Sequence, residues 1–329
     1  MKIAFHSSYL GFRGTEVALM DYAWGNRDLL GHKSLFLLPR RPDAENHPVI
    51  PVMQKIAPVR FYRNSEEREA ILREEAVDFF YCVKNGLNDG VFSRTVPTGV
   101  HAIFRESEFH GDVYAYISDW LSRVMAYGRA SVAPWMVRLA ETTEDLKAEV
   151  GIPEGAWVWG RHGGEDSFDI PWVHQGVAEI AQKNPLIWFL FLNTREFAEA
   201  SGIPNIRFLP GTSDPVRKRA FLNSCDAMIH GRRRGETLGM ACLEFAMAGK
   251  PVLTYADSPE LAHLEILGEA AVRYSNSQEL KELLRHPASI IRRPFGGGDQ
   301  RAGDGRRISR FKQYQPEAVM GKFEEVFLR

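Results

Sequence analysis

Short apolar runs of the kind that form buried strands alternate along most of the chain with amphipathic segments of helical period. In the first half, the helical patterns fall notably at Thr15–Ala23 and Glu66–Glu75. Alternation of this kind indicates an α/β protein with parallel sheets. The strands expected here are Ile3–His6, Ser34–Leu38, Val59–Tyr62, Asp78–Val83, Gly99–Phe104 and Val113–Ile117, with Ser118 as the N-cap of the next helix.

The alternation starts afresh after the turn-rich segment Gly151–Gly155, which predicts a join between two Rossmann-like domains. The expected division is 1–150 for the first domain, 151–312 for the second and 313–329 for a final helix. The second-half strands are expected at Trp157–Gly160, Leu186–Leu192, Ile206–Leu209, Ala227–His230 and Pro251–Thr254. The helices between them are expected at Pro171–Gln182, Pro215–Asn223, Leu238–Ala248 and Pro259–Leu267.

The end of the chain has two parts of different composition. His286–Lys312 holds seven Lys or Arg against two Asp, together with three consecutive glycines. This composition favours a solvated loop, and a contact surface for an anionic acceptor or a lipid headgroup is the alternative. Pro316–Leu328 is expected to be a helix whose apolar stripe packs back toward the first domain.

Composition places the 329 residues among ordinary soluble globular proteins, with 44% hydrophobic and 25% charged residues. A formal net charge of −1 gives no overall attraction to nucleic acid. The three cysteines lie far apart in apolar runs, which favours buried free thiols. The longest apolar run, Leu186–Leu192, is far shorter than the ~20 residues of a membrane span. We therefore expect a cytoplasmic protein, and the sequence leaves peripheral membrane contact open.

The strongest chemical signal is a pair of glutamates, Glu236 and Glu244, between the strand ending at His230 and the stop signal Gly249-Lys250-Pro251. On one helix they would lie ~80° apart, because a helix turns 100° per residue. They can address one ligand only if Glu236 precedes the first turn and Glu244 projects from the second. The N–H groups of Thr237, Leu238 and Gly239 would then form an anion site between them.

This Glu-x7-Glu pattern, with Thr-Leu-Gly after the first glutamate and Ala-Gly-Lys-Pro-Val after the second, resembles the donor-site signature of retaining GT-B glycosyltransferases. The resemblance is to the large family four, which includes sucrose synthase and many bacterial mannosyl- and glucosyltransferases. It implies two Rossmann-like domains facing across a cleft, with Glu236 beside the donor sugar and Glu244 on the ribose.

The resemblance extends to the positive charge of the donor site. Arg161 follows the strand–glycine pattern of the second domain and would pair with the diphosphate. The lysine that the family has several residues later is absent from Glu165–Asp169. Arg232, Arg233 or Arg234 is a candidate replacement, and a solvated loop is the alternative for this cluster.

In the first domain, the segment around Arg13 and Gly14 resembles the family's glycine loop, which approaches the donor phosphate or the acceptor. His101 lies where related enzymes have a histidine facing the donor sugar; a core histidine is the alternative. Lys84 and Asp89 follow a strand and are acceptor-side candidates.

The resemblance implies a retaining hexosyltransferase that takes a UDP- or GDP-sugar as co-substrate and uses no cofactor. The absence of an Asp-x-Asp motif favours chemistry without a metal ion. The acceptor would be a glycan, a lipid-linked molecule or a small molecule. Two alternatives stay open: an inactive nucleotide-sugar or glycan-binding module, and a sugar-nucleotide epimerase on the same fold.

Overall fold

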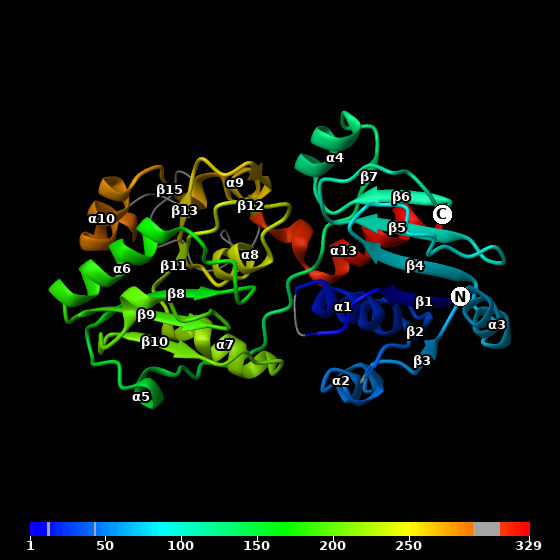
Figure 1. Cartoon of the computed structure of the whole chain (residues 1–329), viewed down its shortest axis with the longest axis horizontal. Coiled ribbons are helices and arrows are strands. Elements are labelled where there is room, and N and C mark those ends of the chain that lie inside the picture. The colour runs from blue at the N-terminus through cyan, green and yellow to red at the C-terminus, as the bar shows by residue number, and fades with distance from the viewer. Residues whose placement is uncertain (12–13, 43, 292–309) are drawn as a thin grey trace. The chain divides into compact units, whose positions relative to one another are not determined.

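The computed structural model describes residues 1–11, 14–42, 44–291 and 310–329, which divide into two compact units (Figure 1). Unit 1 comprises Met1–Val137 and Gln313–Arg329, and unit 2 comprises Arg138–Lys312. The division therefore falls ahead of Gly151–Gly155, and the C-terminal helix belongs to unit 1. Most of the basic segment His286–Lys312 lies outside the described residues.

The described residues of unit 1 form a seven-stranded sheet in the order β3-β2-β1-β4-β5-β6-β7, with parallel neighbours throughout. Its strands are nearly continuous apolar runs, as expected when helices cover both faces of a parallel sheet. The strands are β1 (Lys2–Ser7), β2 (Lys33–Pro39), β3 (Val59–Tyr62), β4 (Phe79–Lys84), β5 (Thr98–Ala102), β6 (Val113–Tyr116) and β7 (Ser131–Val132). The helices are α1 (Gly14–Asp28), α2 (Ile50–Gln54), α3 (Ser65–Glu74), α4 (Asp119–Ala126) and α13 (Pro316–Phe323).

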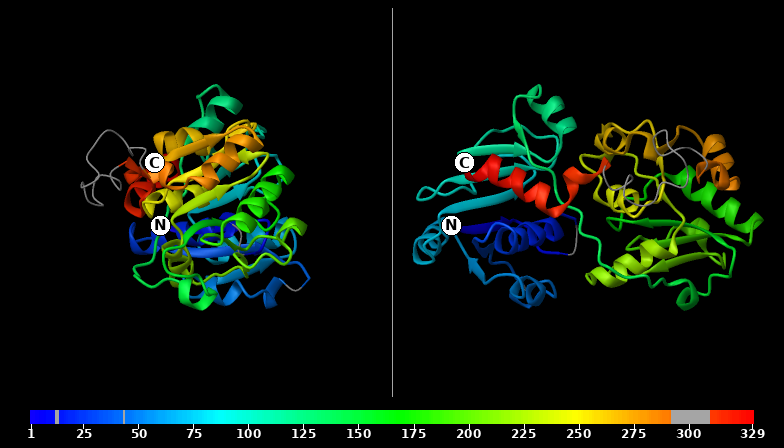
Figure 2. Two further views of the ribbon diagram at one scale, coloured as in Figure 1. Left: turned by 90° about the vertical axis from the view of Figure 1, so that its left-hand side faces the viewer. Right: turned by 180° about the vertical axis from the view of Figure 1, so that it is seen from behind.

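The helix α13 completes the core of unit 1 from the far end of the sequence, as Figure 2 shows from behind. Its Met320 lies so close to α1 that a Cβ at Gly25 would come within 2.6 Å of the Met320 Cγ. Phe323 and, in the π-helical turn Glu324–Leu328, Phe327 pack against Tyr81. Each fully buried side chain of this size contributes roughly 1.5–3 kcal/mol to folding. The predicted helix and its apolar stripe are present.

In the described part of unit 2, six parallel strands follow the order β10-β9-β8-β11-β13-β15. This is the Rossmann order, in which ligands bind outside the carboxyl ends of the strands where the order reverses, here between β8 and β11. The strands are β8 (Trp157–His162), β9 (Ile187–Leu192), β10 (Ile206–Leu209), β11 (Ala227–His230), β13 (Val252–Tyr255) and β15 (Ala271–Tyr274), with β12 (Gly235–Glu236) and β14 (Glu260–Leu261) as a separate pair. The helices are α5 (Lys147–Val150), α6 (Pro171–Lys183), α7 (Pro215–Ser224), α8 (Met240–Met247), α9 (Ala262–Leu267), α10 (Ser277–Arg285) and α11 (Ala288–Ile291).

Several predictions about individual residues are confirmed. Ser118 is the N-cap of α4, and its hydroxyl accepts a hydrogen bond from the Leu121 N–H at 3.2 Å. Cys82, Cys225 and Cys242 are buried free thiols. None of the helices in the described ranges combines the length and the apolar character that crossing a membrane requires.

Candidate functional site

The loop between β11 and α8 carries the two glutamates in the arrangement that a shared ligand requires. Glu236 lies in β12, ahead of the helix, and Glu244 lies in the second turn of α8. The helix begins at Met240, later than the Leu238 of the prediction, because Gly239 is its N-cap with a left-handed φ of 90°. Thr237 and Leu238 are both buried in the bend that precedes this cap.

Glu236 is a partly exposed carboxylate held by His230, at the end of β11, and by Arg232, in the loop that follows. Its Oε1 lies 3.2 Å from His230 Nε2, and its Oε2 accepts a hydrogen bond from Arg232 Nη1 at 2.7 Å. Burial acts to raise the pKa of Glu236, but the hydrogen bond with His230 and the charge of Arg232 outweigh it, and the pKa falls to about 2. Glu236 is therefore ionised at neutral pH and can accept hydrogen bonds from a ligand.

Glu244 is more deeply buried and is held by residues from two other elements. Its Oε1 accepts a hydrogen bond from Lys218 of α7, and its Oε2 lies 2.9 Å from His162 Nε2 at the end of β8. Burial acts to raise its pKa, but Lys218 and His162 outweigh this effect and lower the pKa to about 2. Lys218 and His162 were missed in the sequence, because they lie 26 and 82 residues from Glu244 and in separate elements.

Arg161 lies beside His162 on β8, and its guanidinium is directed at protein groups. It is 3% exposed, and its Nη2 donates to the Gly164 carbonyl at 2.9 Å and to Ser167 Oγ at 2.7 Å. Its Nη1 donates to the hydroxyl of Thr194. Burial lowers the pKa of Arg161 to about 10, and Glu236 is the charged group that opposes this shift most. Arg161 therefore fixes the loop after β8, and its positive charge interacts with the negative charge of Glu236.

Of the three consecutive arginines, Arg232 donates a hydrogen bond to Glu236. Arg234 donates to the buried carboxylate of Glu260 at 2.8 Å, and the main-chain N–H of Arg233 donates to Asp169 at 2.7 Å. These two contacts stabilise the loop. The sequence prediction that Arg232 adds positive charge beside Glu236 is in keeping with this geometry.

His101, in unit 1, is a fully buried residue in the core of that unit. Its Nδ1 lies 2.6 Å from the hydroxyl of Tyr81, and its ring packs against Tyr22, Trp135 and Phe327. Burial lowers its pKa to about 3. The prediction that His101 faces a donor sugar has no support in this geometry, since the strand position was anticipated correctly but the side chain points into the core.

The remaining residues predicted in unit 1 have structural partners or lie at its surface. Lys84 is buried at the end of β4, where it ion-pairs with Asp89, donates to the Val91 carbonyl at 2.9 Å and lies 2.8 Å from His110 Nε2. Gly14 is the first residue of α1, and among the described residues beyond its chain neighbours and its own helix, no atom lies within 4 Å of where its Cβ would be. Arg13 lies outside the described residues.

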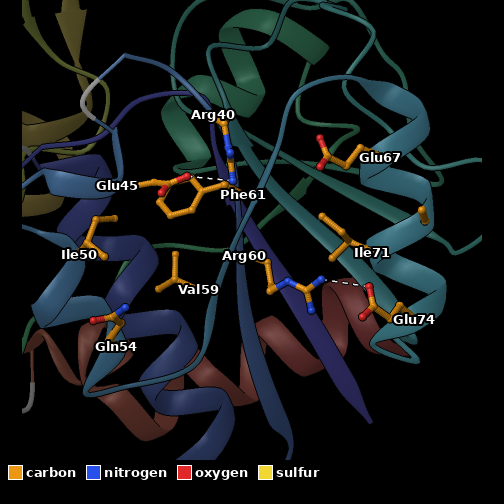
Figure 3. Close-up of a pocket in the computed structure, with 11 residues that line it drawn as sticks. Arg40, Glu45, Ile50, Gln54, Val59, Arg60, Phe61, Glu67, Ile71 and Glu74 are labelled. Atoms are coloured by element: carbon orange, nitrogen blue, oxygen red, sulfur yellow. Dashed lines mark hydrogen bonds and ion pairs between the residues drawn. The ribbon is translucent and has the colours of Figure 1, made fainter.

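A cavity of about 570 Å³ lies elsewhere in unit 1, between α2, β3 and α3 (Figure 3). Two ion pairs join residues that line it, Arg40 with Glu45 and Arg60 with Glu74. None of the described residues that line it belongs to the predicted site. We assign it no part in the chemistry discussed below.

Comparison with known proteins supports the interpretation of unit 2. Residues 191–286 match the family model described as glycosyl transferases group 1. This segment contains Glu236, Glu244, Lys218 and the loop between β11 and α8. The sequence has no match among curated proteins.

Solved structures of low sequence identity share the fold over the whole chain. A glycosyltransferase from Rickettsia africae has a TM-score of 0.73 at 10% identity, covering 99% of this chain and 97% of that one. HepE of Anabaena, in complex with UDP and glucose, has a TM-score of 0.70 at 15% identity, covering 99% and 98%. WaaG, a glycosyltransferase involved in lipopolysaccharide biosynthesis, has a TM-score of 0.62 at 13% identity, covering 98% and 99%. The GT-B fold is thus confirmed, and within it residues 191–286 match the group 1 glycosyl transferase model.

Proposed function

We propose that this group 1 glycosyltransferase is a retaining hexosyltransferase that moves a hexose from a UDP-sugar to an acceptor hydroxyl. The observation that carries the proposal is the pair of ionised carboxylates, Glu236 and Glu244, placed around the start of α8 within the matched segment. UDP is favoured over other nucleotides because HepE, which has the same fold, is described in complex with UDP and glucose.

Glu244 would accept hydrogen bonds from the ribose hydroxyls. A carboxylate has about four lone-pair positions, and Lys218 and His162 approach one oxygen each. Positions therefore stay available for two hydroxyl donors. The charge of Lys218 keeps Glu244 ionised and so keeps it an acceptor.

Glu236 would accept hydrogen bonds from hydroxyls of the donor sugar, with Arg232 and His230 fixing its orientation. The diphosphate would lie against the N–H groups of Thr237, Leu238 and Gly239, ahead of the first turn of α8, where the helix dipole favours an anion. Arg161 and Arg232 add positive charge near Glu236, which stabilises the departing diphosphate. These cations would take the part that a metal ion plays in other transferases.

Retention of anomeric configuration would follow from attack on the face that the diphosphate leaves. The acceptor oxygen bonds to the anomeric carbon as the bond to the diphosphate oxygen breaks, and the leaving phosphate takes the acceptor proton. No protein nucleophile is required. The acceptor is a glycan, a lipid-linked molecule or a small molecule, and we expect residues of unit 1 to bind it.

The proposal is tested with a panel of labelled sugar nucleotides, including UDP-glucose and GDP-mannose, and an acceptor library. Transfer from a UDP-hexose with an unchanged anomeric configuration in the product, read from NMR coupling constants, supports it. Interconversion of two sugar nucleotides would instead identify an epimerase, and binding without turnover a binding module. A thermal-shift screen with UDP, GDP and ADP identifies the base, because a bound ligand stabilises the folded state.

The role of Glu236 is tested by Glu236→Ala, with Glu154→Ala at an exposed turn as the matched control. Loss of a transition-state contact with a charged group is expected to lower kcat by about 100-fold or more. The control variant retains the activity of the wild type. Equal kcat values for Glu236→Ala and the wild type would show that Glu236 makes no such contact with the transition state.

A further inference from the structure

A row of hydrogen-bonding side chains leads away from Glu236 into the interior of unit 2. His230 and Thr254 are register partners on the adjacent strands β11 and β13, and His230 Nδ1 lies 2.8 Å from Thr254 Oγ1. The same hydroxyl lies 3.1 Å from Nε2 of His263 on α9. Thr254 and His263 are fully buried. The row therefore runs Glu236–His230–Thr254–His263 through four separate elements, β12, β11, β13 and α9.

The direction of these hydrogen bonds follows from the chemistry of the two ends. An ionised Glu236 can only accept, so His230 donates from Nε2, and Nδ1 of this Nε2–H tautomer accepts from the Thr254 hydroxyl. The Thr254 oxygen in turn accepts from the Nε2–H of His263. Burial lowers the pKa of His263 to about 3, so its ring is neutral and carries a single N–H.

The far end of the row reinforces this direction. His263 Nδ1 is buried and has no hydrogen-bond partner among the described residues. In the opposite direction His263 would accept at Nε2 and carry its proton on Nδ1, which would bury an unpaired N–H. A buried donor without a partner costs free energy. The structure therefore favours one tautomer for each of the two histidines.

We infer that Thr254 and His263 are positioning residues, which hold His230 in the Nε2–H tautomer and thereby fix the Glu236 carboxylate for the donor sugar. The inference rests on the proposed function of Glu236. Thr254 and His263 themselves touch no substrate, because both are fully buried behind His230.

The surroundings of the row keep its members in place. The hydroxyl of Tyr274, on β15, donates to the His230 carbonyl at 2.9 Å. The rings of His230 and His263 lie 4.9 Å apart between centroids. A Cβ at Gly239 would come within 2.7 Å of the His263 Cβ, so His263 also supports the N-cap of α8. His263 thus supports both Glu236, through Thr254 and His230, and the segment whose amides would face the diphosphate.

The test compares two substitutions of Thr254. Thr254→Val keeps the volume and removes the hydroxyl, whereas Thr254→Ser keeps the hydroxyl and removes a methyl group. If the hydroxyl orients Glu236, Thr254→Val lowers kcat with a UDP-hexose by about tenfold, a typical effect of losing one buried hydrogen bond. Thr254→Ser then stays within about threefold of the wild type. Equal losses of kcat in the two variants would indicate packing and overturn the inference.

A second comparison asks whether Thr254 acts through Glu236. In a Glu236→Gln background, Thr254→Val is expected to lower the remaining kcat no further, because the group that it positions is gone. A tenfold loss in both backgrounds would show that Thr254 acts independently of Glu236, and it would contradict the inference.

The tautomers are measured without any turnover, by ¹⁵N NMR of the full chain with labelled histidine. His230 and His263 are expected as Nε2–H tautomers in the wild type, and His230 changes tautomer in Thr254→Val. An Nδ1–H tautomer of His263 in the wild type would contradict the inferred direction of the hydrogen bonds in the row. If instead the tautomers are as expected and no UDP-hexose is turned over, the inferred row of hydrogen bonds is supported and the proposed function is wrong.

Discussion

Lys218 of α7 ion-pairs with Glu244 of α8, although 26 residues separate them in the sequence. The pair is largely shielded from water, since the side chains of Lys218 and Glu244 are 22% and 7% exposed. A buried carboxylate needs such a partner, because burial alone would raise its pKa and leave it protonated.

Lys218→Met keeps the aliphatic stem and removes this charge. We expect the variant to lose about 3 kcal/mol of unfolding free energy, because an uncompensated buried charge remains. UDP should also bind more weakly, since the Glu244 pKa rises. Urea unfolding and calorimetry measure the two effects. Lys183→Met is the control, because the ion pair of Lys183 with Glu179 is exposed and contributes little to stability. A similar loss of unfolding free energy in both variants would contradict the prediction.

His101 makes the stability of unit 1 depend on pH. The pKa of His101 is about 3 in the folded chain and near its ordinary 6.5 in the unfolded chain. As the pH falls below 6.5 the unfolded state takes up a proton and the folded state does not, so the contribution of His101 is complete above pH 6.5 and is lost progressively toward pH 3.

His101→Gln replaces the titrating ring by a neutral amide. When the pH is lowered from 7 to 5, the unfolding free energy of the wild type is expected to fall by about 2 kcal/mol more than that of the variant. Urea unfolding at the two pH values measures the difference. A loss as large as in the wild type would show that His101 does not carry this dependence.

Gly239→Ala is expected to be more damaging than the same change at another left-handed glycine. At Gly239, with φ of 90°, a Cβ would lie 2.7 Å from the His263 Cβ, whereas at Gly202, with φ of 74°, nothing lies within 4 Å. Backbone strain costs about 1 kcal/mol at both sites, and the clash at Gly239 adds roughly 1–3 kcal/mol. Thermal unfolding of the two variants separates the two effects, and equal melting temperatures would exclude the clash.

Arg161→Lys is expected to raise the KM for the donor by about tenfold, since one ammonium cannot bind Thr194, Gly164 and Ser167 in the geometry of a guanidinium. The loop after β8 would then lose its anchor. Arg195→Lys is the control, because Arg195 is exposed and pairs with Asp166 on the same loop. Initial rates against UDP-sugar concentration measure the effect, and matching KM values in the two variants would show that the loop needs no anchor.

Much of the fold was predictable from local patterns. Val59–Tyr62, Ile206–Leu209 and Ala227–His230 are strands with the predicted bounds, because each is a short, largely apolar run between clear turn signals. The strand Ala271–Tyr274 and the helix Ser277–Arg285 were not predicted. The strand has no turn residue directly before it, since it follows Glu269 and Ala270, and the helix is mostly polar and so lacks a strong apolar signal.

The site was predictable only where its residues are close in sequence. The motif located Glu236, Glu244 and Arg232 within a single loop and helix. Lys218, Thr254 and His263 come from other elements and meet that loop only after folding, so no local pattern indicates them. The ring of His101 packs against Phe327, which follows it by more than 200 residues, so no local pattern indicates the direction of this side chain.

The contribution of α13 to unit 1 has a consequence for the order in which the protein is made. A chain leaves the ribosome from its N-terminus, and domains fold as their residues emerge. Unit 2 is continuous, so all its residues are made before Met320 is added. Unit 1 lacks Met320, Phe323 and Phe327 until the codons that follow those of unit 2 are translated. Unit 1 is therefore expected to complete its native core after unit 2, and a chain that stalls before residue 320 would expose the apolar surface around Tyr22 and Tyr81 to the cell's chaperones.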